Sequence, residues 1–144
     1  FLVNFVQFAQ WQRPGETAAA PIKLCISMGS MGPEAFETFR GRKVRSRPVS
    51  AEFFETGAMP GDCHLVFLGV NLPPARSCML GEAAAMNGAL IVSDTPDFHA
   101  CGGHITFTLI NDRLRFIVNL DAIRASKVEL GSDLLNLAII RNGG

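Results

Sequence analysis

The sequence has no excess of charge of either sign. Lysine and arginine together number 13, aspartate and glutamate also number 13, and the formal net charge at pH 7 is +0. A protein that binds nucleic acid or an anionic membrane surface by electrostatics carries a basic excess. We therefore expect no nucleic-acid partner. A neutral chain also has no net self-repulsion to oppose self-association.

Long apolar runs are absent as well. No run reaches the roughly 18–20 residues that a membrane-spanning helix needs, so we expect no direct membrane insertion. Charged residues make up only 18% of the chain and hydrophobic residues 48%. This composition excludes intrinsic disorder and is typical of a globular protein. A length of 144 residues predicts a single domain over residues 1–144.

The first residue is not a methionine, and no export signal is visible. Phe1 lies inside a stretch with helical periodicity, so we expect that the start is trimmed and that the missing residues could have held an export signal. The chain has four cysteines, and an even count permits two disulfides. It does not by itself establish an oxidising compartment.

Helical and strand patterns alternate over the first two thirds of the chain. Helices are expected at residues 1–11, 33–40, 73–86, 121–126 and 132–139. Strands are expected at residues 22–28, 44–54, 63–69, 89–93, 104–110 and 113–120. Pro48 favours an edge position for the second strand. Asn111 and Asp112 join the last two strands as a hairpin.

This order of elements predicts an α/β fold, a three-layer sandwich around a mixed sheet. A parallel core is followed by the antiparallel C-terminal hairpin. When the six strands are numbered in chain order, the rule that crossovers are right-handed predicts the strand order 2-1-3-4-5-6.

A series of short motifs runs along nearly the whole chain. They are Phe1-x-x-Asn4-Phe5-x-x-Phe8-x-x-Trp11, Leu24-Cys25-Ile26, Gly41-Arg42-x-Val44-x-x-Arg47-Pro48-Val49, Cys63-His64-x-Val66-Phe67-Leu68-Gly69, Val92-Ser93-Asp94-x-Pro96-x-Phe98, Gly102-Gly103-x-Ile105-x-Phe107, Arg113-x-Arg115-Phe116-x-Val118-Asn119-Leu120 and Ser132-x-Leu134-Leu135-x-Leu137-Ala138. Each motif alone is weak. In this order and at this spacing, they resemble the YfiR-like family of bacterial periplasmic proteins.

The resemblance implies a periplasmic regulator that binds a partner, has no catalytic activity and needs no cofactor. The name-giving member represses a membrane diguanylate cyclase by binding its periplasmic domain. An outer-membrane lipoprotein counters the repressor by sequestering it. The outcome is control of cyclic di-GMP and hence of biofilm formation. The resemblance also implies a homodimer, with a diguanylate cyclase or a similar sensor as the partner.

The four cysteines fall into two candidate pairs. Cys25 lies in the first predicted strand and Cys63 begins the third, and these strands are neighbours in the predicted order, so they could bridge if the register permits. The resemblance supports a Cys25–Cys63 disulfide. Cys78 and Cys101 lie toward one edge of the sheet, and a second bridge there is not carried over from the family. An exposed bridge is easier to reduce, and its reduction would loosen a loop, which is a route to redox sensing.

The last hairpin has one polar face. Arg113, Arg115 and Asn119 alternate with apolar residues. We expect this face, together with Phe116 and the helix from Ser132, to contact a protein partner. The alternative is a sheet face that is simply solvated.

Sensing of a small molecule is a second hypothesis for function. The strands at Gly29, Gly69 and Asp94 end at the same edge of the sheet, where open α/β folds bind ligands.

Metal or thiol chemistry is a third hypothesis. His99, Cys101 and His104 are close enough in sequence to bind zinc, although their spacing matches no standard zinc motif. Cys63 and His64 suggest a nucleophile with its base. However, adjacent residues on a strand point to opposite faces, which disfavours this pair.

Overall fold

The computed structural model describes residues 6–7, 9–11, 20–27, 43–44, 47–55, 58–69, 73–95, 98–101, 103–111, 113–126, 128–131, 134 and 139–141. The elements are β1 (Ala9–Trp11), β2 (Ile22–Ser27), β3 (Lys43–Val44), β4 (Arg47–Phe54), β5 (Leu65–Leu68), α3 (Pro74–Met86), β6 (Leu90–Ser93), the 3-10 helix η1 (Phe98–Cys101), β7 (Ile105–Ile110), β8 (Arg113–Asn119), α4 (Leu120–Arg124), β9 (Val128–Leu130) and β10 (Ile139–Arg141).

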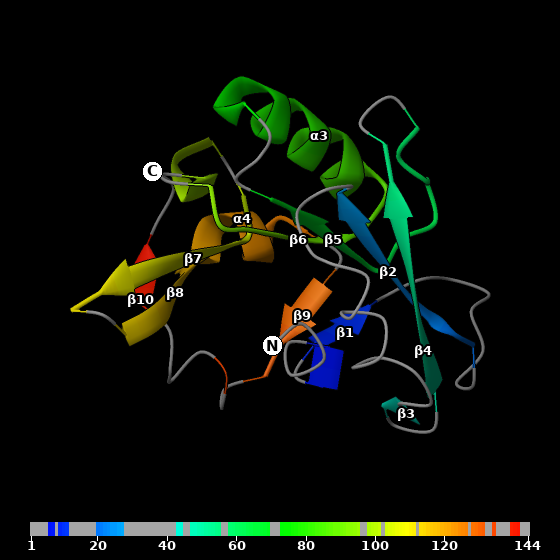
Figure 1. Cartoon of the computed structure of the whole chain (residues 1–144). Coiled ribbons are helices and arrows are strands. Elements are labelled where there is room, and N and C mark those ends of the chain that lie inside the picture. The colour runs from blue at the N-terminus through cyan, green and yellow to red at the C-terminus, as the bar shows by residue number, and fades with distance from the viewer. Residues whose placement is uncertain are drawn as a thin grey trace.

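The main sheet is mixed and has eight strands in the order β10-β8-β7-β6-β5-β2-β4-β3 (Figure 1). Strands β4, β2, β5, β6 and β7 are parallel neighbours, and β8 returns antiparallel to β7. The predicted fold class is confirmed. The six predicted strands keep the order 2-1-3-4-5-6 when β4 is counted as the second. The sheet differs in detail because the strand predicted at residues 44–54 is divided into β3 and β4, which pair antiparallel, and because β10 extends the other edge. Only the two-residue β3 lies beyond β4, which carries Pro48.

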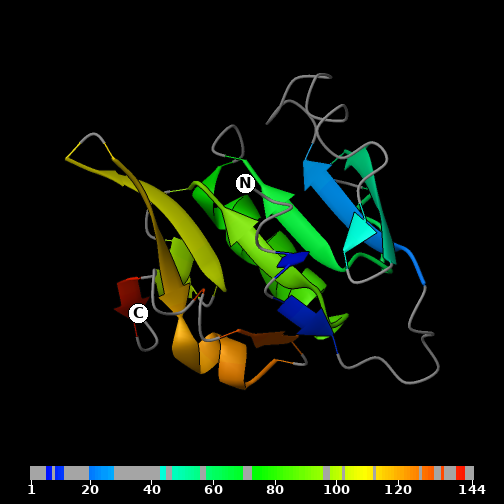
Figure 2. The same cartoon turned by 90° about the horizontal axis from the view of Figure 1, so that it is seen from below.

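Two apolar clusters fill the opposite faces of this sheet. In β5, Leu65 and Phe67 belong to one cluster, while Val66 and Leu68 belong to the other. Successive side chains of a strand point to opposite faces, so a strand buried on both sides is apolar at every position. Helix α3 covers one face, and Figure 2 shows β1, β9 and α4 across the other.

Helix α3 begins and ends where its sequence predicts. Pro74 occupies the first helical position, where a missing N–H costs nothing because that group has no partner inside the helix. At the other end, Gly88 adopts a φ of 81°, in the left-handed region that favours glycine. No helix among the described residues is long and apolar enough to cross a membrane.

The first predicted helix is wrong at its C-terminal end. Val6 and Gln7 are helical, but Ala9–Trp11 forms the strand β1. This strand pairs antiparallel with β9, which the sequence analysis did not predict. Because Ala9 and Trp11 are buried and Gln10 is exposed, the segment also has the two-residue period of a strand. The segment fits both the helical period and the strand period, and its pairing with β9 makes it a strand.

The last predicted helix is also wrong at its end. Leu134 is helical and buried as expected, but Ile139–Arg141 forms β10. This strand lies parallel to β8, with Ile139 opposite Ile117, and it pairs an edge of β8 that would otherwise be open. Ser132, residues 135–138 and the predicted helix at residues 33–40 lie outside the described residues.

The third predicted strand is shorter than expected. Strand β5 begins at Leu65, so Cys63 and His64 precede it rather than belonging to it. The segment between the strands predicted at residues 89–93 and 104–110 contains η1.

Candidate functional site

A disulfide joins Cys25 of β2 to Cys63, just before β5. The two Cα atoms are 6.0 Å apart, and the side chains are 0% and 2% exposed. The neighbouring strands are in the register that the bridge needs, since Leu24 lies opposite Leu65. This first disulfide is therefore part of the core beneath α3.

A second disulfide joins Cys78 of α3 to Cys101 of η1, with 6.0 Å between the Cα atoms. Cys101 is exposed and Cys78 is half-buried. The two disulfides therefore differ in environment: one is enclosed by the core, and the other is open to solvent and to reagents dissolved in it.

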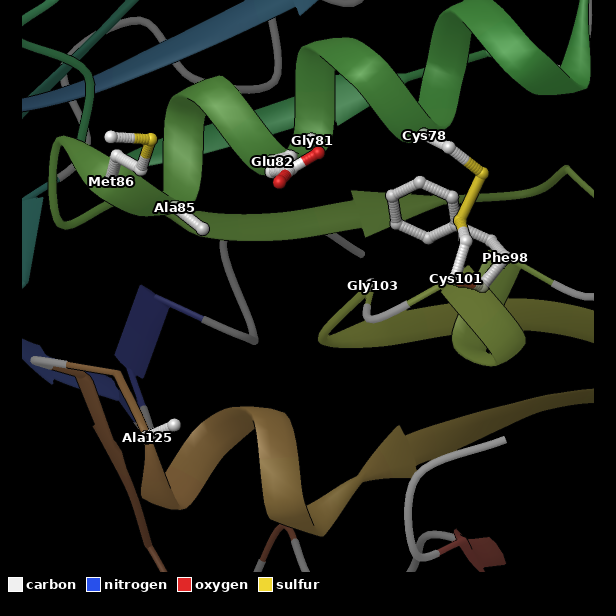
Figure 3. Close-up of a pocket in the computed structure, with 9 residues that line it drawn as sticks. All are labelled: Cys78, Gly81, Glu82, Ala85, Met86, Phe98, Cys101, Gly103 and Ala125. Atoms are coloured by element: carbon white, nitrogen blue, oxygen red, sulfur yellow. Dashed lines mark hydrogen bonds between the residues drawn. A yellow bond between two sulfur atoms is a disulfide. The ribbon is translucent and has the colours of Figure 1, made fainter.

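The exposed disulfide forms part of the wall of a pocket of about 480 Å³ (Figure 3). The residues that line it belong to α3, to η1, to the end of α4 and to the end of the loop between η1 and β7. They are Cys78, Gly81, Glu82, Ala85, Met86, Phe98, Cys101, Gly103 and Ala125. Figure 3 shows the disulfide crossing from α3 to η1 beside the ring of Phe98.

Two glycines make room for the ring of Phe98, which is only 1% exposed. A Cβ atom on Gly103 would collide with the ring, and one on Gly81 would lie 3.1 Å from the ring's Cζ. The N–H of Gly103 also donates to the carbonyl of Phe98 at 3.2 Å. None of the sequence motifs predicted this pocket. An isolated glycine within a helix, Gly81, was the available signal of close packing.

A polar cluster surrounds His64, at the N-terminal ends of β2 and β5. The backbone N–H of Lys23 donates to His64 Nδ1 at 3.0 Å, and a guanidinium nitrogen of Arg47 lies 3.3 Å from His64 Nε2. Arg47 Nε donates to the carbonyl of Ala20 at 2.7 Å, and Trp11 meets the His64 ring edge-on at 5.4 Å between centroids. Trp11, Arg47 and His64 belong to three different sequence motifs, and their contacts here join β1, β2, β4 and β5.

This cluster accounts for His64 without a catalytic role. Cys63 is in a disulfide, so it offers no thiol nucleophile, and His64 Nδ1 already accepts a backbone hydrogen bond. The nucleophile hypothesis therefore has no support in this arrangement.

The metal hypothesis loses two of its three donors. Cys101 is in a disulfide, and His104 is buried with its Nδ1 accepting from the N–H of Ile91 at 3.1 Å. Burial lowers the pKa of His104 to about 4, so its ring is neutral at pH 7. The side chain of His99 lies outside the described part. Among the described residues, no three or more His, Cys, Asp or Glu side chains are grouped to hold a metal.

Two serine hydroxyls at the sheet edge near Gly69 and Asp94 take part in internal hydrogen bonds. Ser27 Oγ accepts from the N–H of Gly69 at 2.9 Å, and Ser93 Oγ donates to the carbonyl of Leu68 at 2.5 Å. Gly29 lies outside the described residues. The pocket described above lies beside α3 and not at this sheet edge. If the protein senses a small molecule, that pocket is the candidate binding site.

The predicted partner face of the hairpin is smaller than expected. Arg115 is exposed, and Phe116 is half-buried against the core. Asn119 is buried, and its Oδ1 accepts from the N–H of Ala122, so it caps α4 and is not available for docking. The side chain of Arg113 lies outside the described part of the chain.

A comparison with known families agrees with the motifs and with the arrangement they produce. A family model described as YfiR/HmsC-like matches residues 1–139, which include both disulfides, the His64 cluster and the pocket. The chain therefore belongs to the YfiR/HmsC-like family.

Proposed function

We propose that this protein is a periplasmic regulator that represses a membrane diguanylate cyclase by binding its periplasmic domain. The observation that carries the proposal is the family match over residues 1–139. The resemblance of the motifs to the YfiR-like family adds the expected outcome, which is lower cyclic di-GMP and less biofilm. An outer-membrane lipoprotein would relieve the repression by sequestering this protein.

The state of the cysteines supports action in an oxidising compartment. All four cysteines are paired in disulfides. Such bonds persist in the periplasm and are rare in the cytoplasm, where thiols are kept reduced.

Repression by binding needs only a difference in affinity for two states of the cyclase. If the protein binds the inactive state more tightly, occupancy shifts the cyclase toward that state. A shift from 1:99 to 99:1 needs roughly 10⁴-fold tighter binding, about 5.5 kcal/mol. An interface of ordinary size supplies such differences, so no catalytic group is required.

The contact surface that we propose is the face of the β7–β8 hairpin that carries Arg115. Figure 2 shows the hairpin reaching beyond the rest of the sheet, where a partner can approach it. Arg115 is exposed, and arginine is enriched among the residues that dominate binding energy. Phe116 points to the other face of β8 and packs against the core. We also propose that the protein acts as a homodimer, which light scattering of the purified protein tests.

The function is tested by removing the gene from its host and measuring cyclic di-GMP. Loss of the protein should raise cyclic di-GMP and biofilm. An exported copy should restore both, and a copy kept in the cytoplasm should not. Unchanged cyclic di-GMP in the deletion strain would refute the proposal.

The contact surface is tested by capture of the cyclase from host membranes. Arg115→Glu should weaken capture at least tenfold, roughly 1.4 kcal/mol. The matched control is Arg76→Glu, an exposed arginine on α3 and therefore outside the hairpin. If the control weakens capture and Arg115→Glu does not, the partner binds the α3 side.

Redox or ligand sensing is a second candidate function, favoured by the exposed Cys78–Cys101 disulfide in the wall of the pocket. Reduction of this bond would release η1 from α3. The test is capture of the cyclase by protein with this bond reduced and the Cys25–Cys63 bond intact. Unaltered capture would exclude redox control.

A further inference from the structure

We propose that the pocket between α3, η1 and α4 binds a small organic cation with an apolar, aromatic body. The inference goes beyond repression of a cyclase and does not depend on it, because it concerns binding to the purified protein. It rests on the shape of the pocket, the chemistry of its walls and one carboxylate.

The size of the pocket suits a small molecule. A volume of about 480 Å³ lies within the roughly 300–1,000 Å³ of ligand pockets in general. The walls come from three elements that are distant in sequence: α3, η1 with the residues that follow it, and the end of α4. Ala85 and Ala125 each carry only a methyl group, which keeps the space between the walls open.

The apolar part of the wall suits an aromatic group. The ring of Phe98 is buried within the wall, and the disulfide of Cys78 and the exposed Cys101 lies beside that ring in Figure 3. Met86 is 84% exposed, an unusual position for a large apolar side chain. Thioether sulfur makes favourable contacts with aromatic rings and adapts its shape to them. An aromatic ligand would cover surface that is now in contact with water.

The charge of the wall suits a cation. Glu82 is the one ionisable side chain among the lining residues apart from the bonded cysteines. Among the described residues, no lysine or arginine forms an ion pair with it, whereas Lys23 pairs with both Glu52 and Asp62. Glu82 lies one turn from Cys78 and one turn from Met86 along α3, so the carboxylate and the apolar groups share one face of the helix. An ammonium group beside an aromatic ring matches this pattern.

The ligand class is tested with three probes of similar size and different charge. They are 2-phenylethylamine, which is a cation at pH 7, 2-phenylethanol, which is neutral, and 3-phenylpropanoate, which is an anion. Binding to the intact, oxidised protein is measured by calorimetry and by NMR shifts of residues around the pocket. The amine should bind about fivefold more tightly than the alcohol and at least about twentyfold more tightly than the acid, because one ion pair is gained or reversed. Equal affinities, or shifts that map elsewhere, would overturn the proposal.

Substitutions at Ala125 distinguish the effect of charge on ligand binding from the effect of side-chain size. This residue is exposed, follows the last turn of α4 and lies across the pocket from α3 (Figure 3), so a longer side chain there should leave the fold intact. Ala125→Glu should strengthen binding of the amine two- to fivefold, and Ala125→Lys should weaken it by a similar factor. Ala125→Gln is the matched control for size and should lie between them.

Removal of the carboxylate gives an independent check. Glu82→Gln should remove the preference for the amine over the alcohol while leaving the affinity for the alcohol unchanged. Glu55→Gln, which changes an exposed carboxylate at the end of β4, is the control and should leave the preference intact. If Glu82→Gln retains the preference, or if the three Ala125 variants bind the amine equally, the site is not selective for cations and the proposal fails. None of these outcomes bears on whether the protein represses a cyclase.

Discussion

The ring of Phe98 occupies the space in which a Cβ atom of residue 103 would lie, so only glycine fits at Gly103. The same ring is 1% exposed and forms part of the pocket wall. One contact between two residues five positions apart thus positions η1, the exposed disulfide and the start of β7.

Gly103→Ala should lower the free energy of unfolding by about 1–3 kcal/mol, because the added methyl group must displace the ring or the backbone. The control is Gly61→Ala, where the nearest atom to a new Cβ is Asn87 Nδ2 at 4.0 Å. That variant should change stability by less than about 0.5 kcal/mol. Chemical denaturation measures both, and equal effects would contradict the packing described for Phe98.

The two disulfides should differ in their rate of reduction. Cys101 is exposed, while Cys25 and Cys63 are buried in the core, so a mild reductant reaches the Cys78–Cys101 bond first. Alkylation at timed intervals followed by peptide mapping should label Cys78 and Cys101 well before the other pair. Simultaneous labelling would mean that the core opens as easily as the surface.

Loss of either disulfide should lower stability, and loss of the buried Cys25–Cys63 bond should lower it more. The closed loops span 38 and 23 positions, and in the chain-entropy model each bond contributes roughly 3–4 kcal/mol. We expect the paired substitution Cys78→Ala with Cys101→Ala to cost this much in denaturation experiments. The paired substitution at Cys25 and Cys63 should cost more, since it also leaves a cavity in the core. The reverse order would contradict the burial described here.

Stability should fall on acidification because of His104. Burial lowers its folded-state pKa to about 4 from an ordinary value of 6.5. Between these values the unfolded chain binds the proton and the folded chain does not. The contribution is therefore complete above pH 6.5 and is lost as the pH falls toward about 4. The total is about 3 kcal/mol. His104→Gln, which can still accept a hydrogen bond, should flatten the pH profile of unfolding over this range, and an unchanged profile would exclude His104 as its cause.

Asn119 should matter for the fold of α4. Its side chain accepts the hydrogen bond from Ala122 N–H at 3.1 Å that caps the helix. Asn119→Ala should cost about 1 kcal/mol or more and should speed amide exchange in α4. Asn119→Ser keeps an acceptor and should cost less. If the two variants are equally stable, the cap contributes little.

The core of the sheet was predictable from local pattern. The run around Val66 and Phe67 is apolar at successive positions, which requires burial on both faces. The order of the strands on either side of it follows from the handedness of the crossovers. The predictions were wrong where the apolar residues of one segment fit both the helical period and the strand period. Ala9 and Trp11 suit a helix face or a strand face, and Ile139 suits a buried helix or an edge strand.

The sequence by itself determined the class of the fold, the order of the central strands and the family, because these follow from the spacing of apolar residues and from motifs that are each local in the chain. Only the tertiary structure decided that Cys101 is exposed while Cys63 is buried, that Asn119 caps a helix, and that Glu82 shares a pocket with Phe98. These facts depend on packing between segments far apart in sequence, and no local pattern encodes which surfaces such packing leaves open.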